Sequence, residues 1–155
     1  MQPEKEIEMT LDRISKENRK VAAFISETFP SVAGQIIPKK GVLQNIYGAV
    51  RSRGGLCIAD EVKTGLGRLG DFMFAFEQQE VIPDIVVLGK PLGNGYPIGA
   101  VVTNRKIADS FANGIEFFST FGGSNLSCTV GLEVLKIVQE ENLASNAKEH
   151  PMSFA

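Results

Sequence analysis

Two short apolar runs with a helical pattern between them constrain the fold of this chain more than any other feature. The runs cover residues 21–25 and 56–59, and apolar side chains recur at helical spacing across residues 42–50. A basic residue and two glycines at 53–55 are typical of a helix end. A strand, a helix and a second strand within about forty residues form a βαβ unit, which requires parallel strands and a right-handed crossover. The sequence therefore predicts an α/β fold.

Further patterns fill in the rest of the sheet and its helices. Apolar runs at residues 85–88 and 100–102 extend the sheet, which we predict to be mostly parallel with flanking helices. The polar segment 1–20 carries scattered apolar side chains, which indicates a short surface helix. Residues 108–112 indicate another short helix, and an amphipathic pattern over residues 126–139 predicts a longer one.

The composition is that of an ordinary globular protein and argues against several functions. Hydrophobic residues make up 43% and charged residues 22%, and the net charge is −2. The sequence thus offers no electrostatic basis for binding nucleic acid or an anionic membrane. No apolar run is long enough to span a membrane. The only histidine, His150, argues against histidine-based catalysis and multi-histidine metal sites.

The two cysteines bear on the compartment. Cys57 lies in an apolar run and Cys128 in the longer predicted helix, and their spacing is not that of a disulfide framework. We therefore expect both to be reduced interior thiols of an intracellular protein, in the cytoplasm or the mitochondrial matrix.

Opposite charges follow two of the predicted strands. Asp60 comes directly after the run 56–59, and Lys90 follows the run 85–88 after one glycine. Because parallel strands end at the same edge of a sheet, we expect the carboxylate and the lysine in one crevice. A partly desolvated lysine there suits Schiff-base chemistry. The pair suits pyridoxal phosphate, with the lysine bonded to the aldehyde and the carboxylate keeping the ring nitrogen protonated. A simple ion pair between neighbouring strands is the alternative for the pair. For Lys90 alone, the alternative is a lysine that extends from the strand end into solvent.

Two glycine-bearing loops each have two interpretations. Residues 65–70 match the G-x-G-x-x-G pattern of dinucleotide sites, although residues 61–64 separate them from the preceding strand end. Residues 119–123 precede a helix, where backbone N–H groups and hydroxyls can bind a phosphate. The alternative for this second loop is an N-cap, with Ser124 or Asn125 capping the helix.

Three ordered segments resemble one known family. Residues 60–68, D-E-V-K-T-G-L-G-R, resemble the D-E-V-Q-x-G-x-G-R signature of class III pyridoxal-phosphate aminotransferases. Residues 83–102 resemble the family's segment with the cofactor lysine, and residues 119–123, S-T-F-G-G, resemble its T-[FY]-G-G loop. The resemblance implies that residues 21–148 are part of the large domain of a fold type I enzyme, between the polar segment 1–20 and an irregular tail at 149–155.

The resemblance implies roles for the residues around the cofactor. Lys90 would be the Schiff-base lysine and would carry a proton between the substrate α-carbon and the cofactor C4′. Asp60 would pair with the pyridine nitrogen, and Val62 would pack against one face of the ring. Lys63 stands where the family usually has a glutamine that contacts the 3′-oxygen of the cofactor, so it adds a positive charge there.

The resemblance also implies a substrate side and a partner. Glu27 would line the substrate side of the site. Thr120 would reach the cofactor phosphate of the neighbouring subunit, which implies a homodimer. Family catalysis transfers an amino group between an amine or amino acid and an oxo acid or aldehyde.

Two other functions stay open. Residues 34–38 and 114–118 are similar to the branch that contains the phospho-lyases of phosphoethanolamine and phosphohydroxylysine, which eliminate phosphate and ammonia. The family's glycine–serine phosphate cup, its ring-stacking aromatic residue and its small domain have no counterpart in the 155 residues. We therefore expect a central fragment of the large domain, and a non-catalytic truncated fragment is the further alternative.

Overall fold

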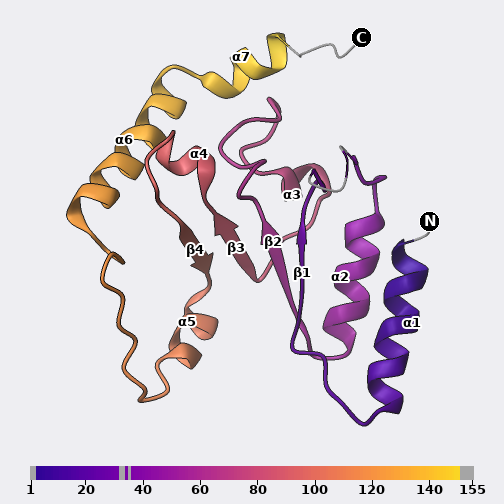
Figure 1. The fold of residues 1–155 in the computed structure, drawn as a ribbon. Coiled ribbons are helices and arrows are strands. Elements are labelled where there is room, and N and C mark those ends of the chain that lie inside the picture. The colour runs from indigo at the N-terminus through magenta and orange to yellow at the C-terminus, as the bar shows by residue number, and fades with distance from the viewer. Residues whose placement is uncertain (1–2, 32–33, 35, 151–155) are drawn as a thin grey trace.

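A four-stranded sheet forms the centre of the protein, in a computed structural model that describes residues 3–31, 34 and 36–150. The strands lie in the order β1 (Ala23–Glu27), β2 (Leu56–Asp60), β3 (Ile85–Leu88) and β4 (Ala100–Thr103) (Figure 1). β1, β2 and β3 are parallel, and β4 runs antiparallel to β3. The predicted α/β fold with a mostly parallel sheet is confirmed.

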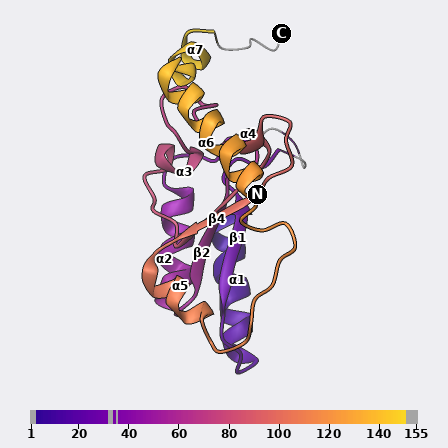
Figure 2. The ribbon, with the colours of Figure 1, turned by 90° about the vertical axis from the view of Figure 1, so that its left-hand side faces the viewer.

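Helices flank this sheet in the described part of the chain. They are α1 (Pro3–Lys16), α2 (Val42–Ser52), α3 (Ala75–Gln78), α4 (Lys90–Gly93), α5 (Arg105–Phe111), α6 (Asn125–Glu140) and α7 (Leu143–Glu149). α2 connects β1 to β2 and completes the predicted βαβ unit. Both ribbon views place α7 beyond the carboxyl ends of β1, β2 and β3, whereas α5 lies at the opposite end of the sheet (Figures 1 and 2).

The sequence patterns do not predict three of these helices, α3, α4 and α7. α4 begins at Lys90, directly before Pro91. Pro91 is compatible with the helix because it lies in the first turn, where a backbone N–H has no helical partner. Asn94 ends the helix in the left-handed conformation, with φ of 44°. One or two turns are too short to produce a periodic pattern.

The main core lies between one face of the sheet and helices α1 and α2. Its buried side chains come from both helices, from β2 and from the segment before β3: Leu11, Leu43, Ile46, Tyr47, Val50, Cys57 and Val81. Each such apolar side chain contributes about 1.5–3 kcal/mol on full burial. Arg53, just after α2, also binds α1 by donating to Glu8 Oε2 and Asp12 Oδ1, both at 2.8 Å. The polar segment 1–20 thus packs on the sheet domain through α1.

Side-chain alternation gives the sheet two different faces. Cys57 and Ala59 point toward α2 and are 0% and 1% exposed. Asp60 points to the other face, as does Glu27, its partner in the β1–β2 register. That face is open in the described chain, where Ile25 is 61% exposed. The two carboxylates therefore lie at the end of the open face.

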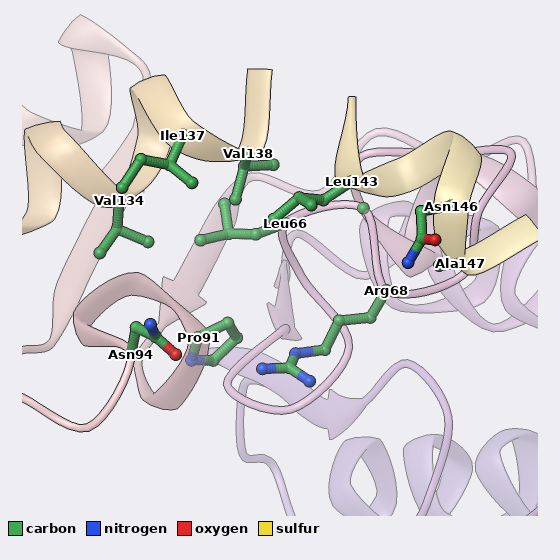
Figure 3. A pocket seen from close by; sticks show the side chains of 11 residues that line it. Leu66, Arg68, Pro91, Asn94, Val134, Ile137, Val138, Leu143, Asn146 and Ala147 are labelled. Carbon is green, nitrogen blue, oxygen red and sulfur yellow. The ribbon is translucent and has the colours of Figure 1, made fainter. Parts of the chain in front are cut away.

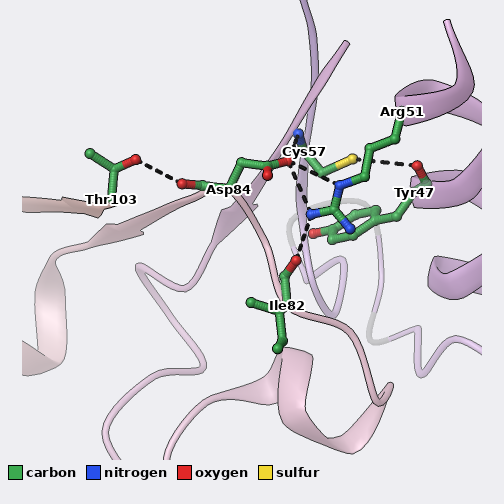
Figure 4. Close-up of polar contacts among 6 residues, drawn as sticks. All are labelled: Tyr47, Arg51, Cys57, Ile82, Asp84 and Thr103. Atoms are coloured by element: carbon green, nitrogen blue, oxygen red, sulfur yellow. Dashed lines mark hydrogen bonds and ion pairs between the residues drawn. The ribbon is translucent and has the colours of Figure 1, made fainter. Parts of the chain in front are cut away.

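Asp84, immediately before β3, joins the start of that strand to its neighbours (Figure 4). Its Oδ2 accepts hydrogen bonds from Arg51 Nε at 3.2 Å, from Arg51 Nη2 at 3.0 Å and from the Cys57 N–H at 2.8 Å. Its backbone carbonyl accepts from the Thr103 hydroxyl at 2.8 Å. These bonds fix β3, and with it the approach to Lys90, relative to α2, β2 and β4.

The two cysteines differ in environment. Cys57 is buried, as predicted, but Cys128 is exposed, so the expectation of two interior thiols is wrong for Cys128. The reason is that α6 is only partly covered: Gly131 is its one buried residue.

Two structural features bear on membranes and metals. Within the described ranges, no helix is both long and apolar enough to cross a bilayer. The same ranges contain no group of three or more histidine, cysteine, aspartate or glutamate side chains that could hold a metal ion.

Candidate active site

Asp60 and Lys90 lie at the same edge of the sheet. Asp60 ends β2 and pairs with Val87 of β3, and Lys90 follows β3 as the first residue of α4. Asp60 is half-buried, and its Oδ1 accepts a hydrogen bond from the Val62 N–H at 2.9 Å. Among the described residues, Asp60 and Lys90 form no ion pair. Lys90 is exposed, so the expected juxtaposition is present without the expected desolvation of the amine.

Val62 touches the backbone just before Lys90. A Cβ atom added at Gly89 would lie 3.0 Å from Val62 Cγ1 and 3.3 Å from Cγ2, tighter than ordinary carbon contacts. Glycine at this position therefore lets the turn after β2 approach the end of β3 closely. The contact places Asp60, Val62 and Lys90 around one short stretch of the edge.

Glu27 lies beside Asp60 at this edge, at the end of β1. Its Oε2 accepts hydrogen bonds from the Ser31 N–H at 2.7 Å and the Ser31 hydroxyl at 2.8 Å. These bonds lower the pKa of Glu27 below its ordinary value, and the positive charges of Lys63 and Lys90 lower the pKa further.

The other two residues singled out from the sequence are exposed. Lys63 lies in the turn after β2, close to the residues above. Thr120 lies between α5 and α6, where all side chains from residue 111 to 123 are exposed. In the described chain no hydrogen bond joins Thr120 to the other site residues. The structure therefore gathers Glu27, Asp60, Val62, Lys63 and Lys90, listed here in chain order, and leaves Thr120 apart.

A hollow of about 970 Å³ lies on the side of the sheet that α1 and α2 cover. It is lined by the first turns of α1 and α2, the end of β1 and residues 36–39. Glu27 is the one site residue in its wall, and Asp60 and Lys90 do not line it.

Two glycines of the loop at residues 65–70, Gly67 and Gly70, allow α7 to pack closely against the loop. Gly67 and Gly70 have positive φ angles of 77° and 84°, which favour glycine. A Cβ at Gly67 would lie 2.9 Å from the Ala144 Cβ, and one at Gly70 would lie 2.9 Å from the Lys148 Cα. The loop thus needs glycine so that α7 can approach, and it does not open a helix as a dinucleotide motif would.

The same loop and α7 enclose a smaller cavity of about 280 Å³ (Figure 3). The figure shows Val134 and Val138 of α6 on one side and Pro91 with the Arg68 side chain on the other. Its lining is mainly apolar and comes from α4, α6, α7 and the loop. The cavity therefore marks the junction of these helices with the glycine loop.

At the start of α6 the capping interpretation is confirmed, since the Ser124 hydroxyl accepts from the Ser127 N–H at 3.5 Å.

Sequence reasoning did not identify one further residue beside the site, Glu61. It is fully buried beside Asp60 and accepts hydrogen bonds from the hydroxyls of Thr28 and Thr64. Its donors include Thr28, 33 residues away, so no local sequence pattern indicates this burial.

Comparison with known proteins supplies the family. The family model for class III aminotransferases matches residues 2–155. The chain belongs to the class III aminotransferase family. It is 52% identical over 128 residues to the alanine–glyoxylate aminotransferase 2-like protein of Drosophila melanogaster, covering 82% of this chain and 26% of the fly protein.

Solved members and relatives of this family have the same fold. A phospholyase from Arthrobacter in complex with phosphoethanolamine superposes with a TM-score of 0.86 and 34% identity, over 92% of this chain and 34% of that one. The ornithine aminotransferase of Toxoplasma gondii, with partial occupancy of PLP at its active site, gives a TM-score of 0.79 and 38% identity, over 90% and 31%. This class III chain thus spans about a quarter to a third of the length of these relatives.

Proposed function

We propose that this chain carries the lysine-bearing part of an aminotransferase active site, with pyridoxal phosphate held through Lys90. The observation that carries the proposal is the contact of Val62 with Gly89, because it brings the strand end with Asp60 against the residue before Lys90. Membership of the class III family supports the same assignment.

The residues at the sheet edge fit this cofactor. Pyridoxal phosphate, when bound, supplies an aldehyde that bonds to an amine and a protonated ring that withdraws electrons. Lys90 offers an exposed amine, Asp60 a half-buried carboxylate on the adjacent strand, and Val62 an apolar side chain beside both. These groups suit the aldehyde, the ring nitrogen and the ring face of the cofactor.

Each of these residues then has a distinct task. Lys90 would hold the cofactor through its amine and would move a proton at the substrate α-carbon. Asp60 would accept a hydrogen bond from the ring N–H and stabilise its positive charge. Val62 would pack on the ring and keep it aligned. Lys63 would donate a hydrogen bond near the ring, and Glu27 would orient the substrate.

A second candidate function is elimination of phosphate and ammonia from a phosphorylated amino alcohol. It is supported by the similarity to the Arthrobacter phospholyase, which superposes with a TM-score of 0.86 at 34% identity. Incubation with phosphoethanolamine separates the two: phosphate release supports the lyase, and amino transfer to an oxo acid supports the transaminase.

We further propose a homodimer in which Thr120 reaches the cofactor phosphate of the partner subunit. The exposure of residues 111–123, including Phe117 at 72% and Phe118 at 79%, supports an association through this segment. Light scattering tests it, and a monodisperse monomer would contradict it. The compartment, cytoplasm or mitochondrial matrix, stays a prediction.

The direct test is to add pyridoxal phosphate to the chain, reduce with borohydride and map the labelled peptides. We expect the label on Lys90, with a marked decrease in Asp60→Ala. Lys106 in α5, an exposed lysine at the opposite end of the sheet, gives the background for surface amines.

Equal labelling of Lys90 and Lys106 would overturn the proposal for this chain. It would favour the alternative of a non-catalytic fragment that keeps the motif without a working pocket. Loss of label in Lys90→Ala alone, without a change at Lys106, would support the assignment of the cofactor lysine.

A further inference from the structure

A buried hydrogen-bond network lies directly behind the candidate site. Glu61 is 0% exposed and Thr28 is 1% exposed. Glu61 Oε1 accepts from the Thr28 hydroxyl at 2.7 Å and the Phe76 N–H at 3.0 Å. Glu61 Oε2 accepts from the Thr64 hydroxyl at 2.7 Å and the Ala75 N–H at 3.1 Å. The two oxygens thus have four donors, which matches the acceptor capacity of a carboxylate.

Every side chain of this network is a sequence neighbour of a site residue. Thr28 directly follows Glu27, and Glu61 directly follows Asp60. Thr64 directly follows Lys63. The network therefore holds the backbone at three places: the end of β1, the end of β2 and the turn after β2.

The geometry of the strands links the positions of the network side chains to those of the site side chains. The parallel pairing continues past the strand ends, because the Glu61 N–H donates to the Val87 carbonyl at 2.9 Å and the Thr28 N–H to the Asp60 carbonyl at 3.5 Å. Successive side chains of an extended chain point to opposite faces. Fixing Thr28 and Glu61 on the covered face therefore fixes Glu27 and Asp60 on the open face.

We propose that Glu61 is a positioning residue: through Thr28 and Thr64 it sets Glu27, Asp60 and Lys63 relative to Lys90. A role of Glu61 in catalysis rests on the proposed function, whereas the positions that it fixes do not depend on that function. Hydrogen bonds from hydroxyls and N–H groups to a buried carboxylate are short and strong. Removing one donor leaves an oxygen short of a partner where water cannot replace it.

The test uses single-donor variants, because Glu61→Ala risks unfolding the chain. Thr64→Val and Thr28→Val remove one hydroxyl each at nearly constant shape, and Thr64→Ser and Thr28→Ser restore it. Thr103→Val is the matched control, since it removes a hydroxyl bonded to the Asp84 carbonyl at 2.8 Å. Thr103 ends the antiparallel strand, at the sheet end away from Lys90.

Two readouts are taken at a temperature where every variant is folded. The first is the ratio of borohydride-fixed pyridoxal phosphate label on Lys90 to that on Lys106. The second is the titration midpoint of the Glu27 carboxyl by NMR. We expect the valine variants to reduce the labelling ratio about tenfold, because misplacement by about 1 Å can cost up to about 100-fold in reactivity. The Glu27 midpoint should rise in Thr64→Val, as Lys63 moves away.

The serine variants and Thr103→Val should match the parent chain in both readouts. Unchanged ratio and midpoint in both valine variants would overturn the positioning role. An equal change in Thr103→Val would overturn it as well, because the effect would then follow lost stability. If the parent chain itself labels Lys90 no better than Lys106, the proposed function fails, and the Glu27 midpoint alone decides the positioning role.

Discussion

Arg51 of α2 and Asp84 before β3 meet through two hydrogen bonds to a single carboxylate oxygen, Nε to Oδ2 at 3.2 Å and Nη2 to Oδ2 at 3.0 Å. The arginine also donates to the Ile82 carbonyl at 2.6 Å and lies 5.4 Å from the centre of the Tyr47 ring. Its side chain is 41% exposed and that of Asp84 only 22%. The pair therefore joins the helix of the βαβ unit to the strand that leads to Lys90.

Asp84→Ala should lower the free energy of unfolding by about 2 kcal/mol, because Arg51 and the Cys57 N–H both lose their acceptor. Asp84→Asn should cost about half as much, since an amide oxygen still accepts. The matched control is Asp109→Ala, which breaks an exposed pair with Arg105 and should cost about 0.5 kcal/mol or less. Urea unfolding measures all three, and equal losses at positions 84 and 109 would contradict the structural role.

The two thiols should react at very different rates. Burial raises the pKa of Cys57 to about 11, so this thiol stays protonated and inaccessible near neutral pH, whereas Cys128 is exposed. A disulfide reagent at about pH 8 should modify one thiol quickly in the native chain and both after denaturation. Cys128→Ser should abolish the fast phase. A fast phase that survives in Cys128→Ser would show that Cys57 is accessible.

Replacement of the groups that lower the pKa of Glu27 should raise this pKa by different amounts. Ser31→Ala removes the largest cause of the lowered pKa, and Lys63→Gln removes a smaller one. The pKa of Glu27 should thus rise toward 4.5 in both variants, and more in Ser31→Ala. Because the folded-state pKa is lowered, the stabilisation from Glu27 is present above 4.5 and is lost as the pH falls through the lowered value.

NMR of the side-chain carboxyl carbon measures these midpoints. Lys63→Arg keeps the charge and should leave the Glu27 midpoint near that of the parent chain. A midpoint that does not move in Lys63→Gln would mean that Lys63 lies too far away to take part in the site.

Gly70→Ala should be more damaging than a glycine substitution where only the backbone conformation matters. Gly54, with φ of 79° and no atom within 4 Å of an added Cβ, is that control and should cost about 1 kcal/mol. Gly70 has a similar φ of 84°, but its new Cβ would meet the backbone of Lys148. We expect about 2 kcal/mol of further loss. Equal thermal shifts in the two variants would contradict the close packing of α7.

Much of the sheet could be predicted because apolar runs and chain breakers are local signals. Residues 56–59 and 85–88 coincide with β2 and β3 to within one residue. The first strand was predicted at 21–25 but lies at Ala23–Glu27. Ser26 and Glu27 lack strand character on their own, and they belong to β1 because Ala59 and Asp60 pair with them.

The shared edge of Asp60 and Lys90 followed from parallel strands, but the structure around it depends on distant partners. Nothing near Glu61 in the sequence predicts its complete burial, because its donors include Thr28, 33 residues away. Similarly, the seven residues of α7 form a helix on the glycine loop without a periodic pattern of their own. The exposure of Lys90 was also not predictable, since a residue-level pattern does not say what covers a sheet edge.

The reversed direction of β4 has a consequence for how the chain can vary in length. Because this strand runs against its neighbours, the chain leaves the sheet at the end away from Lys90 and must return along it, through α5 and residues 112–124, to reach α6. Residues 112–123 are exposed throughout. Insertions there would lengthen the return path while leaving Asp60, Val62 and Lys90 in register.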